Sequence, residues 1–478
     1  MRLSENNDVF VLSYSFVNGG NEQVDCLYNC ISWKRGSRFE SASGYPVYSI
    51  HYSIVSERMR YVPAFALFAV LLGLAAADNW AVIIGGSNSY SNYRHQANIA
   101  HQYHQYLDYG VKPEHIIVFD YDDVANSKKN PFPGKLYNLP GDDAKDYYEG
   151  LVIDYREKEI TKEALFNCLL GIEDGSGKKV LKSTSEDKVF INYYDHGAPN
   201  LIALIDDRVK KEELQEVLIK MHDKKMFSEL VFYLEACDSA TMMTDFPDDL
   251  NIYVVTSTDA AVSGWACFCP PEDMAHGKHI GACLSEEFGY AYMKDMDENG
   301  GADTFDEQFK YISDAMKKSK PKQWASTVFR NETLAAFFGV NKKIVRPSEV
   351  RATPSTFWDT RDNKLMSLAS LLGRTDLSYE LRQSVMMEYA EEAKIREVTD
   401  RLIHAVVART VGEELFEEMM TPVERVKNTQ CYYAAVEEMD RLVPQSDYEL
   451  KYFTVLANLC DRTGMRRLPI MLVVCWKK

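Results

Sequence analysis

The chain has 478 residues, and its 54 basic and 71 acidic side chains give a formal net charge of −17. This length allows two or three domains, and the acidic balance argues against binding to nucleic-acid phosphates. The ten cysteines lack the paired spacing of a structural zinc site. His95, His101 and His104 have no accompanying carboxylate or cysteine ligands. We therefore expect no nucleic-acid partner, no metal ion and no cofactor.

Residues 59–77, MRYVPAFALFAVLLGLAAA, have the features of a secretory signal peptide. Arg60 precedes an apolar stretch that ends in small residues. The stretch is short for a span of ~20 residues, so cleavage near Ala77 is favoured over a signal anchor, and we expect no stable membrane span. Because a signal peptide begins a chain, residues 1–58 are interpreted as an upstream extension outside the mature protein.

Short apolar runs alternate with helical patterns from Asp78 to about Gly339. The runs that predict strands are Trp80–Ile84, His115–Phe119, Val189–Tyr193, Leu230–Leu234 and Ile252–Thr256. The segments that predict helices are Arg94–Leu107, Lys162–Leu170, Lys210–Lys224, Leu284–Met293 and Thr304–Lys318. This alternation predicts an α/β domain over residues 78–339, with a mostly parallel sheet sandwiched by helices.

The sequence changes character after this domain. Residues 340–363 have little apolar periodicity and are interpreted as a linker. Residues 364–478 are rich in Leu, Met, Glu and Ala at helical spacing and predict a separate all-helical domain.

Two of the predicted strands lead into reactive side chains. Val189–Tyr193 is followed by His196, and Leu230–Leu234 is followed by Cys237. Parallel strands end at the same edge of a sheet, so the imidazole and the thiol are expected to lie close together. Alone, each residue has a simpler interpretation, as a loop histidine or a buried thiol. Together they favour a cysteine nucleophile with a histidine base.

The residues around this pair point to a family. Tyr194-Asp195-His196-Gly197 and Phe232-Tyr233-Leu234-Glu235-Ala236-Cys237-Asp238-Ser239 are similar to the two active-site segments of legumains. The stretches from Ser91 to Ala97 and from Tyr121 to Ala125 are similar to two further blocks. The chain therefore resembles the legumain (asparaginyl endopeptidase) family, which is caspase-like in fold.

The resemblance implies a cysteine endopeptidase that cleaves protein and peptide substrates after Asn, and after Asp at acid pH. It implies that Cys237 is the nucleophile, His196 the general acid and base, and Asn92 the residue that orients the imidazole. The N–H groups of Gly197 and Cys237 would form the oxyanion hole.

The resemblance also implies a pocket for the substrate side chain. Arg94, His95, Glu235 and Ser263 would line it, and Trp265 would form a wall of the cleft. The family's second pocket carboxylate is an Asp, whereas this chain has Glu286. Charged Asp would be repelled by the pocket carboxylates, and protonated Asp would resemble Asn.

Other residues match positions of the family outside the catalytic centre and the pocket. Asp195 matches an aspartate tied to peptide ligation, although a simple loop carboxylate is an equal interpretation. The resemblance implies the disulfides Cys269–Cys283 and Cys431–Cys460 and leaves Cys475 single. Cys168 and Cys267 are expected to be buried free thiols.

Maturation is the last expectation. By resemblance, the helical domain is an inhibitory prodomain released by self-cleavage at low pH, after Asn341 or Asn363 in the linker. Interface carboxylates facing Arg or Lys would neutralise and weaken the contact. Asn331-Glu332-Thr333 is a glycosylation acceptor. A lysosome-like or extracellular location and cystatin-type inhibitors are also expected. The alternatives are a peptide ligase, a glycosylphosphatidylinositol transamidase subunit and a non-catalytic pseudoprotease.

Overall fold

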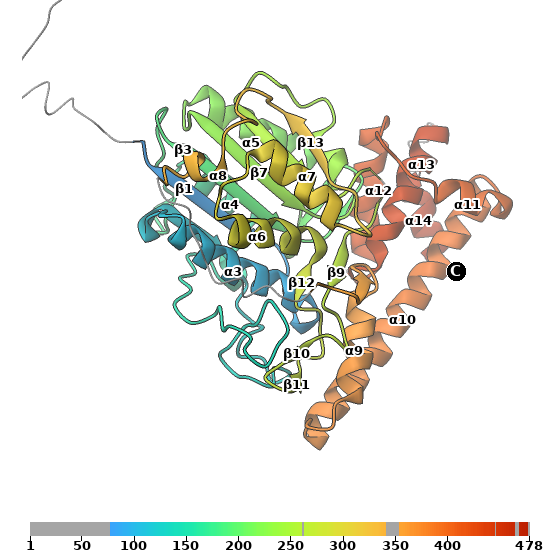
Figure 1. Cartoon of the computed structure of the whole chain (residues 1–478). Helices are drawn as coiled ribbons and strands as arrows, with labels where there is room; N and C mark the ends of the chain where they lie inside the picture. The colour runs from blue at the N-terminus through green and yellow to red at the C-terminus, as the bar shows by residue number, and fades with distance from the viewer. Residues whose placement is uncertain (1–76, 261, 341–352, 445, 464–467, 477–478) are drawn as a thin grey trace, which may run out of the picture. The chain divides into compact units, whose positions relative to one another are not determined.

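A computed structural model describes residues 77–260, 262–340, 353–444, 446–463 and 468–476 (Figure 1). The expected signal peptide, the upstream extension and the cleavage site at Asn341 lie outside the described residues, except for Ala77.

The centre of the structure is a six-stranded sheet in the order β13-β8-β7-β3-β1-β2. The strands are β1 Asn79–Gly85, β2 Ile116–Phe119, β3 Lys188–Tyr194, β7 Glu229–Glu235, β8 Ile252–Thr256 and β13 Lys322–Ala325. Every pairing is parallel except that of β13 with β8. The five predicted strands and the mostly parallel sheet are confirmed. The sequence did not predict β13, because this half-exposed edge strand has no apolar run.

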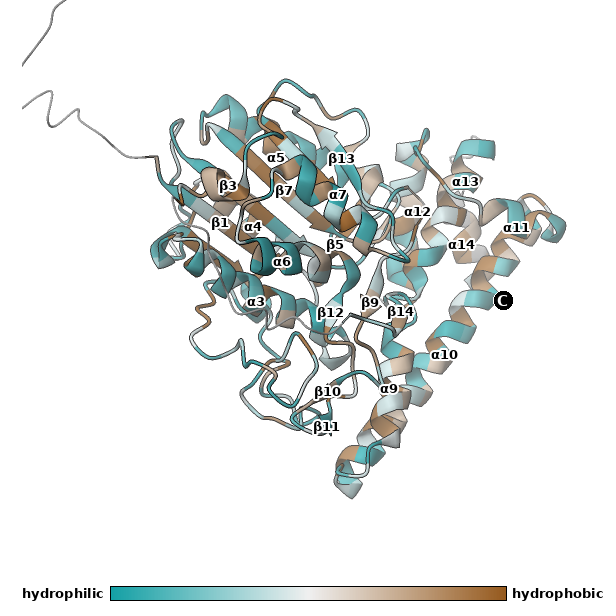
Figure 2. Cartoon of the chain, viewed as in Figure 1, coloured by the Kyte–Doolittle hydropathy of each residue, from teal (hydrophilic) through white to brown (hydrophobic). Residues whose placement is uncertain are grey.

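Helices cover both faces of this sheet (Figure 1). Successive residues of β1 point to opposite faces: Val82 and Ile84 pack in one core cluster, and Ala81 and Ile83 pack in the other. The first cluster includes residues of α4 Lys162–Leu169 and α5 Lys211–Asp223; the second includes residues of α3 Tyr93–Asp108, α6 Glu287–Asn299, α7 Phe305–Ala315 and α8 Leu334–Phe337. Figure 2 shows the hydrophobic strands between helices whose outer surfaces are hydrophilic.

One predicted helix begins later than expected. Leu284 donates its backbone N–H to Phe268, and Ser285–Glu286 forms β12, so α6 begins only at Glu287. β12 pairs with β9 Trp265–Cys267, which also pairs with β14 Phe357–Asp359. The prediction of a helix from Leu284 was wrong at its start, because pairing with a distant strand overrides the local helical pattern.

Several other short elements have no strong sequence signal. β4 Gly197–Ala198, β5 Leu201–Leu204 and β6 Asp207–Lys210 form one small sheet, and β10 Met274–Ala275 pairs with β11 Lys278–His279. The 3-10 helices are η1 Tyr90–Asn92, η2 Pro113–His115, η3 Glu157–Glu159, η4 Ser239–Met243, η5 Glu413–Leu415 and η6 Glu449–Tyr452.

The C-terminal region is helical, as the sequence predicted. Its helices are α9 Asn363–Gly373, α10 Tyr379–Thr410, α11 Phe416–Met419, α12 Thr429–Leu442, α13 Phe453–Thr463 and α14 Leu468–Trp476. Their hydrophobic core also includes Ala198 and Leu201 of the small β4-β5-β6 sheet, so the helical region packs against the α/β domain. Within the described ranges, no helix is long and apolar enough to cross a membrane.

Candidate active site

The thiol and the imidazole lie on neighbouring strand ends. β3 and β7 pair in parallel, with Tyr194 opposite Glu235, so the loops that carry His196 and Cys237 leave the sheet side by side. A Cβ atom on Gly197 would lie 2.3 Å from the backbone oxygen of Cys237. The two loops therefore touch through backbone, which only glycine permits at this position.

The imidazole of His196 is held from two sides. Its Nε2 atom lies 3.0 Å from Oδ1 of Asn92 and 3.3 Å from Oδ2 of Asp447 in the helical region. Asn92, in η1, is fixed in turn by Arg94, whose Nη1 donates to the same amide oxygen at 2.9 Å. Nδ1 of His196 is buried and has no hydrogen-bond partner among the described residues. Asn92 thus lies where it could orient the ring.

The thiol of Cys237 is buried beneath residues 355–361, the covering segment, which forms the end of the expected linker. The N–H of Gly264 donates to its sulfur at 3.1 Å, and the hydroxyl of Thr360 also lies 3.1 Å away. Burial raises the pKa of the Cys237 thiol to about 11. His196 is not among the described hydrogen-bond partners of this sulfur. The thiol is therefore protonated and covered in this arrangement.

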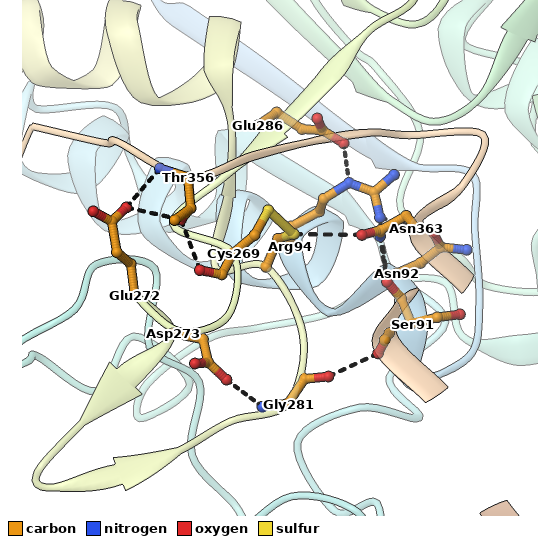
Figure 3. The surroundings of a disulfide bond; sticks show 12 residues. Ser91, Asn92, Arg94, Cys269, Glu272, Asp273, Gly281, Glu286, Thr356 and Asn363 are labelled. Carbon is orange, nitrogen blue, oxygen red and sulfur yellow. Dashed lines mark hydrogen bonds and ion pairs between the residues drawn. A yellow bond between two sulfur atoms is a disulfide. The ribbon is translucent and has the colours of Figure 1, made fainter. Parts of the chain in front are cut away.

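A pocket of buried charge adjoins the thiol. Arg94 is fully buried, and its Nε donates to Glu286 (Figure 3). Nε2 of His95 lies 2.7 Å from the same carboxylate oxygen. Glu235 ends β7, two residues before Cys237, and a Cβ on Gly264 would lie 3.5 Å from its carboxylate. The four residues are contributed by α3, β7 and β12, which converge at this edge.

The two pocket carboxyl groups have opposite pKa shifts. Burial, reinforced by the nearby charge of Glu286, raises the pKa of Glu235 well above its usual range. Burial acts on Glu286 as well, but Arg94 and His95 outweigh it and lower the pKa of that carboxyl. Burial also lowers the pKa of His95 to about 3, so its ring is neutral. Glu286 is therefore the more acidic of the two pocket carboxyl groups, and Glu235 is the more readily protonated.

Three pocket atoms have no hydrogen-bond partner among the described residues. Among the described residues, Nη2 of Arg94 and the Oε2 atoms of Glu235 and Glu286 are buried without a hydrogen bond. Buried polar groups are normally paired, so such atoms mark a place for a ligand. Ser263 and Trp265 are half-buried on the segment entering β9. Lys318 stacks over the Trp265 ring at 5.1 Å.

Asp195 is buried beside the imidazole, and burial raises its pKa to about 7. Ligand atoms of His95, Asp195 and His196 lie within 4.8 Å of one another. Both ring nitrogens of His95 are already engaged, by Ser87 at 2.5 Å and by Glu286 at 2.7 Å. These three residues are therefore not arranged as a ready metal site.

The structure contains both disulfides that the sequence analysis named. Cys269 is bonded to Cys283, and Cys431 is bonded to Cys460. The free cysteines among the described residues are Cys168, Cys237, Cys267 and Cys475, and all are buried.

Asn331 and Asn363, which were predicted for glycosylation and for processing, differ in exposure. Asn331, in the glycosylation triplet, is exposed. Asn363 is fully buried at the first position of α9, and its side-chain N–H donates to the Ser91 carbonyl at 2.7 Å. A peptidase needs an accessible, extended segment, so Asn363 is unsuitable as a cleavage site in this arrangement. Asn341 stays a prediction.

The sequence did not predict that residues at the end of the linker and in the helical region contact the site. The backbone N–H of Thr360 donates to Gly264 at 3.2 Å, Arg361 pairs with Asp238 at 2.5 Å, and Asp447 faces His196. A cavity of about 180 Å³ beside Asp195 and His196 is lined on this side by Lys364, Ser446 and Asp447. None of these residues stands in a recognisable motif, because their role depends on docking.

Comparisons with known proteins agree with one another. Residues 79–341 match the model of the Peptidase C13 family. The chain is 32% identical to the vacuolar-processing enzyme delta-isozyme of Arabidopsis thaliana, over 81% of this chain and 87% of that protein. It is 31% identical to mouse (Mus musculus) legumain, over 80% of this chain and 88% of that protein. A Schistosoma japonicum hemoglobinase is 38% identical, over 55% of this chain and 61% of that protein.

Proposed function

The chain belongs to the Peptidase C13 family and is a cysteine endopeptidase, and from this premise we propose that it cleaves peptide bonds after Asn, and after Asp at acid pH. In this proposal Cys237 is the nucleophile, and the pocket beside it selects the residue before the cleaved bond.

The observation that carries the specificity is the set of unpartnered pocket atoms. A carboxamide has one carbonyl acceptor and an NH₂ group with two donors. Nη2 of Arg94 can donate to the carbonyl, and the Oε2 atoms of Glu235 and Glu286 can accept from the NH₂ group. An ionised Asp side chain would instead place a second negative charge beside Glu286. Asp is therefore accepted only when it is protonated.

The chemistry follows from the strand-end pair. With the covering segment gone, His196 takes the thiol proton, and the sulfur of Cys237 attacks the substrate carbonyl carbon. The N–H groups of Gly197 and Cys237 stabilise the oxyanion. His196 then gives its proton to the leaving amine, and water hydrolyses the acyl-enzyme. Asn92 keeps the ring oriented through its bond to Nε2.

The helical region acts as an inhibitory prodomain in this proposal. Thr360 covers the thiol, and Asp447 faces the imidazole, so neither catalytic group is available. Cleavage in the linker, at Asn341, would allow these groups to leave at low pH. An acidic compartment of the secretory pathway suits this behaviour. The name of one relative, the vacuolar-processing enzyme of Arabidopsis thaliana, refers to such a compartment.

The deciding experiment is a peptidase assay on the acid-incubated chain. Fluorogenic Ala-Ala-Asn should be cleaved at pH 5, Ala-Ala-Asp should be cleaved well only near pH 4, and Ala-Ala-Gln should not be cleaved. Cys237→Ala should abolish cleavage, whereas Cys168→Ala, which removes another buried thiol, should not. Activity that survives Cys237→Ala would refute the mechanism, and equal cleavage of Asn and Gln would refute the specificity.

A further inference from the structure

The segment that covers the thiol lies along β9 as an added strand. β14 pairs antiparallel with β9, with Phe357 opposite Cys267 and Asp359 opposite Trp265. The next residue, Thr360, donates its backbone N–H to Gly264 and reaches the thiol of Cys237 with its side chain. Strand addition of this kind binds a peptide through its backbone, whatever its side chains.

The pairing of β14 with β9 assigns a substrate position to each residue of the covering segment. Thr360 stands where the residue before the cleaved bond (P1) would stand, because it faces the nucleophile. A substrate running in the same direction would place its P2, P3 and P4 residues along β9. Its P5 and P6 residues would then take the places of Thr356 and Ser355.

A single carboxylate receives the residues at these two outer places. Glu272 accepts the backbone N–H groups of Ser355 at 3.0 Å and Thr356 at 2.9 Å, and Figure 3 shows the contact with Thr356. It also accepts the Ser355 hydroxyl, and the Thr356 hydroxyl lies 2.8 Å from it. The Thr356 hydroxyl lies 2.7 Å from the carbonyl of Cys269 as well. Both hydroxyl groups thus meet acceptors of the peptidase domain.

The acceptors are built into the α/β domain and do not depend on the covering segment. Glu272 donates its own backbone N–H to Cys269 at 2.8 Å, and Cys269 is fixed by the disulfide to Cys283. Burial acts on Glu272, but hydrogen bonds from Ser355 and Thr356 outweigh it and lower the pKa of this carboxyl. The lowered pKa comes from the segment's own hydrogen bonds, but the position of Glu272 on the cross-linked loop does not, so the acceptor stays in place when the segment leaves.

We propose that Glu272 forms a remote substrate subsite that favours hydroxyl-bearing residues, Ser at P6 and Thr at P5. The subsite rests on the proposed function, because it becomes free only when the covering segment is released. The covering segment then occupies the site as a pseudo-substrate whose outer residues use the same acceptors. The shared chemistry is a hydroxyl group that donates its one hydrogen to a carboxylate or to a backbone carbonyl.

The test compares two peptides that differ only in these hydroxyl groups. Ser-Thr-Ala-Ala-Ala-Asn and Ala-Val-Ala-Ala-Ala-Asn, each with a fluorogenic group after Asn, are given to the acid-incubated full-length chain. Hydrogen bonds to charged groups are strong, so kcat/KM should be about tenfold higher for the first peptide. Glu272→Ala should lower the ratio to about threefold or less, because only the Cys269 carbonyl remains to accept a hydroxyl group. Glu272→Gln, which keeps one acceptor oxygen, should leave an intermediate ratio. Cleavage of the short Ala-Ala-Asn peptide should be unchanged in both variants.

Glu186→Ala is the matched control, because Glu186 is exposed in the loop before β3, at the opposite end of the strand from the site. It should keep the tenfold ratio. Equal kcat/KM for the two peptides in the wild type, or a tenfold preference that is undiminished in Glu272→Ala, would overturn the subsite while leaving the proposed function intact. Failure of the wild type to cleave Ala-Ala-Asn would instead overturn the proposed function, and the subsite with it.

Discussion

The hydroxyl of Thr360 lies 3.1 Å from the sulfur of Cys237, although 123 residues separate them in the chain. The contact buries the thiol, and burial raises its pKa to about 11, so the reactive thiolate is scarce in the uncut chain. Desolvation therefore lowers the reactivity of the nucleophile, and the covering segment also blocks access to it. Removing the segment would reverse both effects.

The ion pair next to this contact should control leakage, which is the residual peptidase activity of the uncut chain. Arg361 lies 2.5 Å from Asp238, whose side chain is only 1% exposed. Breaking a buried pair by removing one partner costs about 3–5 kcal/mol, so Arg361→Ala should loosen the segment. We expect at least a tenfold rise in Ala-Ala-Asn cleavage at pH 6, measured while gel electrophoresis shows the chain intact.

The control for this variant is Arg401→Ala, because Arg401 is 70% exposed on α10 and its one ion pair among the described residues is with exposed Glu397 at 3.6 Å. Its leakage should match that of the wild type. Unchanged leakage in Arg361→Ala would show that the segment is held by other contacts.

The pH at which the segment leaves should depend on Asp447. Burial acts on this carboxyl, but His196 and then Lys364 outweigh it and lower the pKa of Asp447 below its usual range. A contact that lowers an acid's pKa is strongest above the free pKa, about 3.9 for Asp, and is lost as pH falls through the lowered value. The Asp447 contact should thus survive pH 5 and weaken only below about pH 4.

Asp447→Asn removes this charge at every pH. Its self-processing should begin about one pH unit higher than that of the wild type, as judged by loss of the full-length band between pH 3 and 7. Glu397→Gln, which changes an exposed carboxylate of the same region, should process like the wild type. Identical onset in Asp447→Asn and the wild type would rule out a role for this contact.

Two other interface carboxyls have the opposite sign. Asp440 and Glu449 face Arg208 at 3.4 and 3.2 Å, and burial raises the pKa of both. A pKa that is raised while the helical region is docked means that acid favours the docked state. The expectation that carboxylates facing Arg or Lys weaken the interface on acidification therefore does not hold for these two residues. Asp447, which faces His196, has a lowered pKa and can act in that direction.

The sequence predicted the strands and the strand-end pair because these depend on local patterns. Runs such as Val189–Tyr193 are apolar, β-branched and of strand length, and parallel pairing then sets His196 beside Cys237. The start of α6 and the docking of Thr360 could not be predicted this way. Both depend on pairing with β9, a strand of three residues whose partners, β12 and β14, come from distant parts of the chain.

The pocket carboxylate Glu286 should affect both the rate and the choice of substrate. Glu286→Gln removes the charge that Arg94 and His95 share, so kcat/KM for Ala-Ala-Asn should fall about a hundredfold, as for loss of a buried charged hydrogen bond. Less negative charge in the pocket should also narrow the difference between Asn and Asp substrates at pH 6.

The matched variant is Glu298→Gln, because Glu298 is exposed on α6, the helix that follows Glu286. It should leave both quantities unchanged. Thermal melting separates loss of the pocket from loss of the fold: an Asn-to-Asp ratio that stays at the wild-type value in folded Glu286→Gln would contradict the assigned role.

Gly197 should be intolerant of any side chain, because the space for one is taken by backbone. A Cβ there would lie 2.3 Å from the oxygen of Cys237 and 3.0 Å from Cβ of Ala236, and no rotamer change can move a backbone oxygen. Gly197→Ala should therefore push the two catalytic loops apart, destabilise the fold by about 1–3 kcal/mol and lower kcat/KM at least a hundredfold. Gly373→Ala is the contrasting variant, since nothing lies within 4 Å of its Cβ position in α9 and alanine favours helix by up to about 1 kcal/mol. Thermal melting should show a lower midpoint for Gly197→Ala and an equal or higher one for Gly373→Ala; a Gly197→Ala protein with wild-type melting and activity would disprove the backbone contact between the loops.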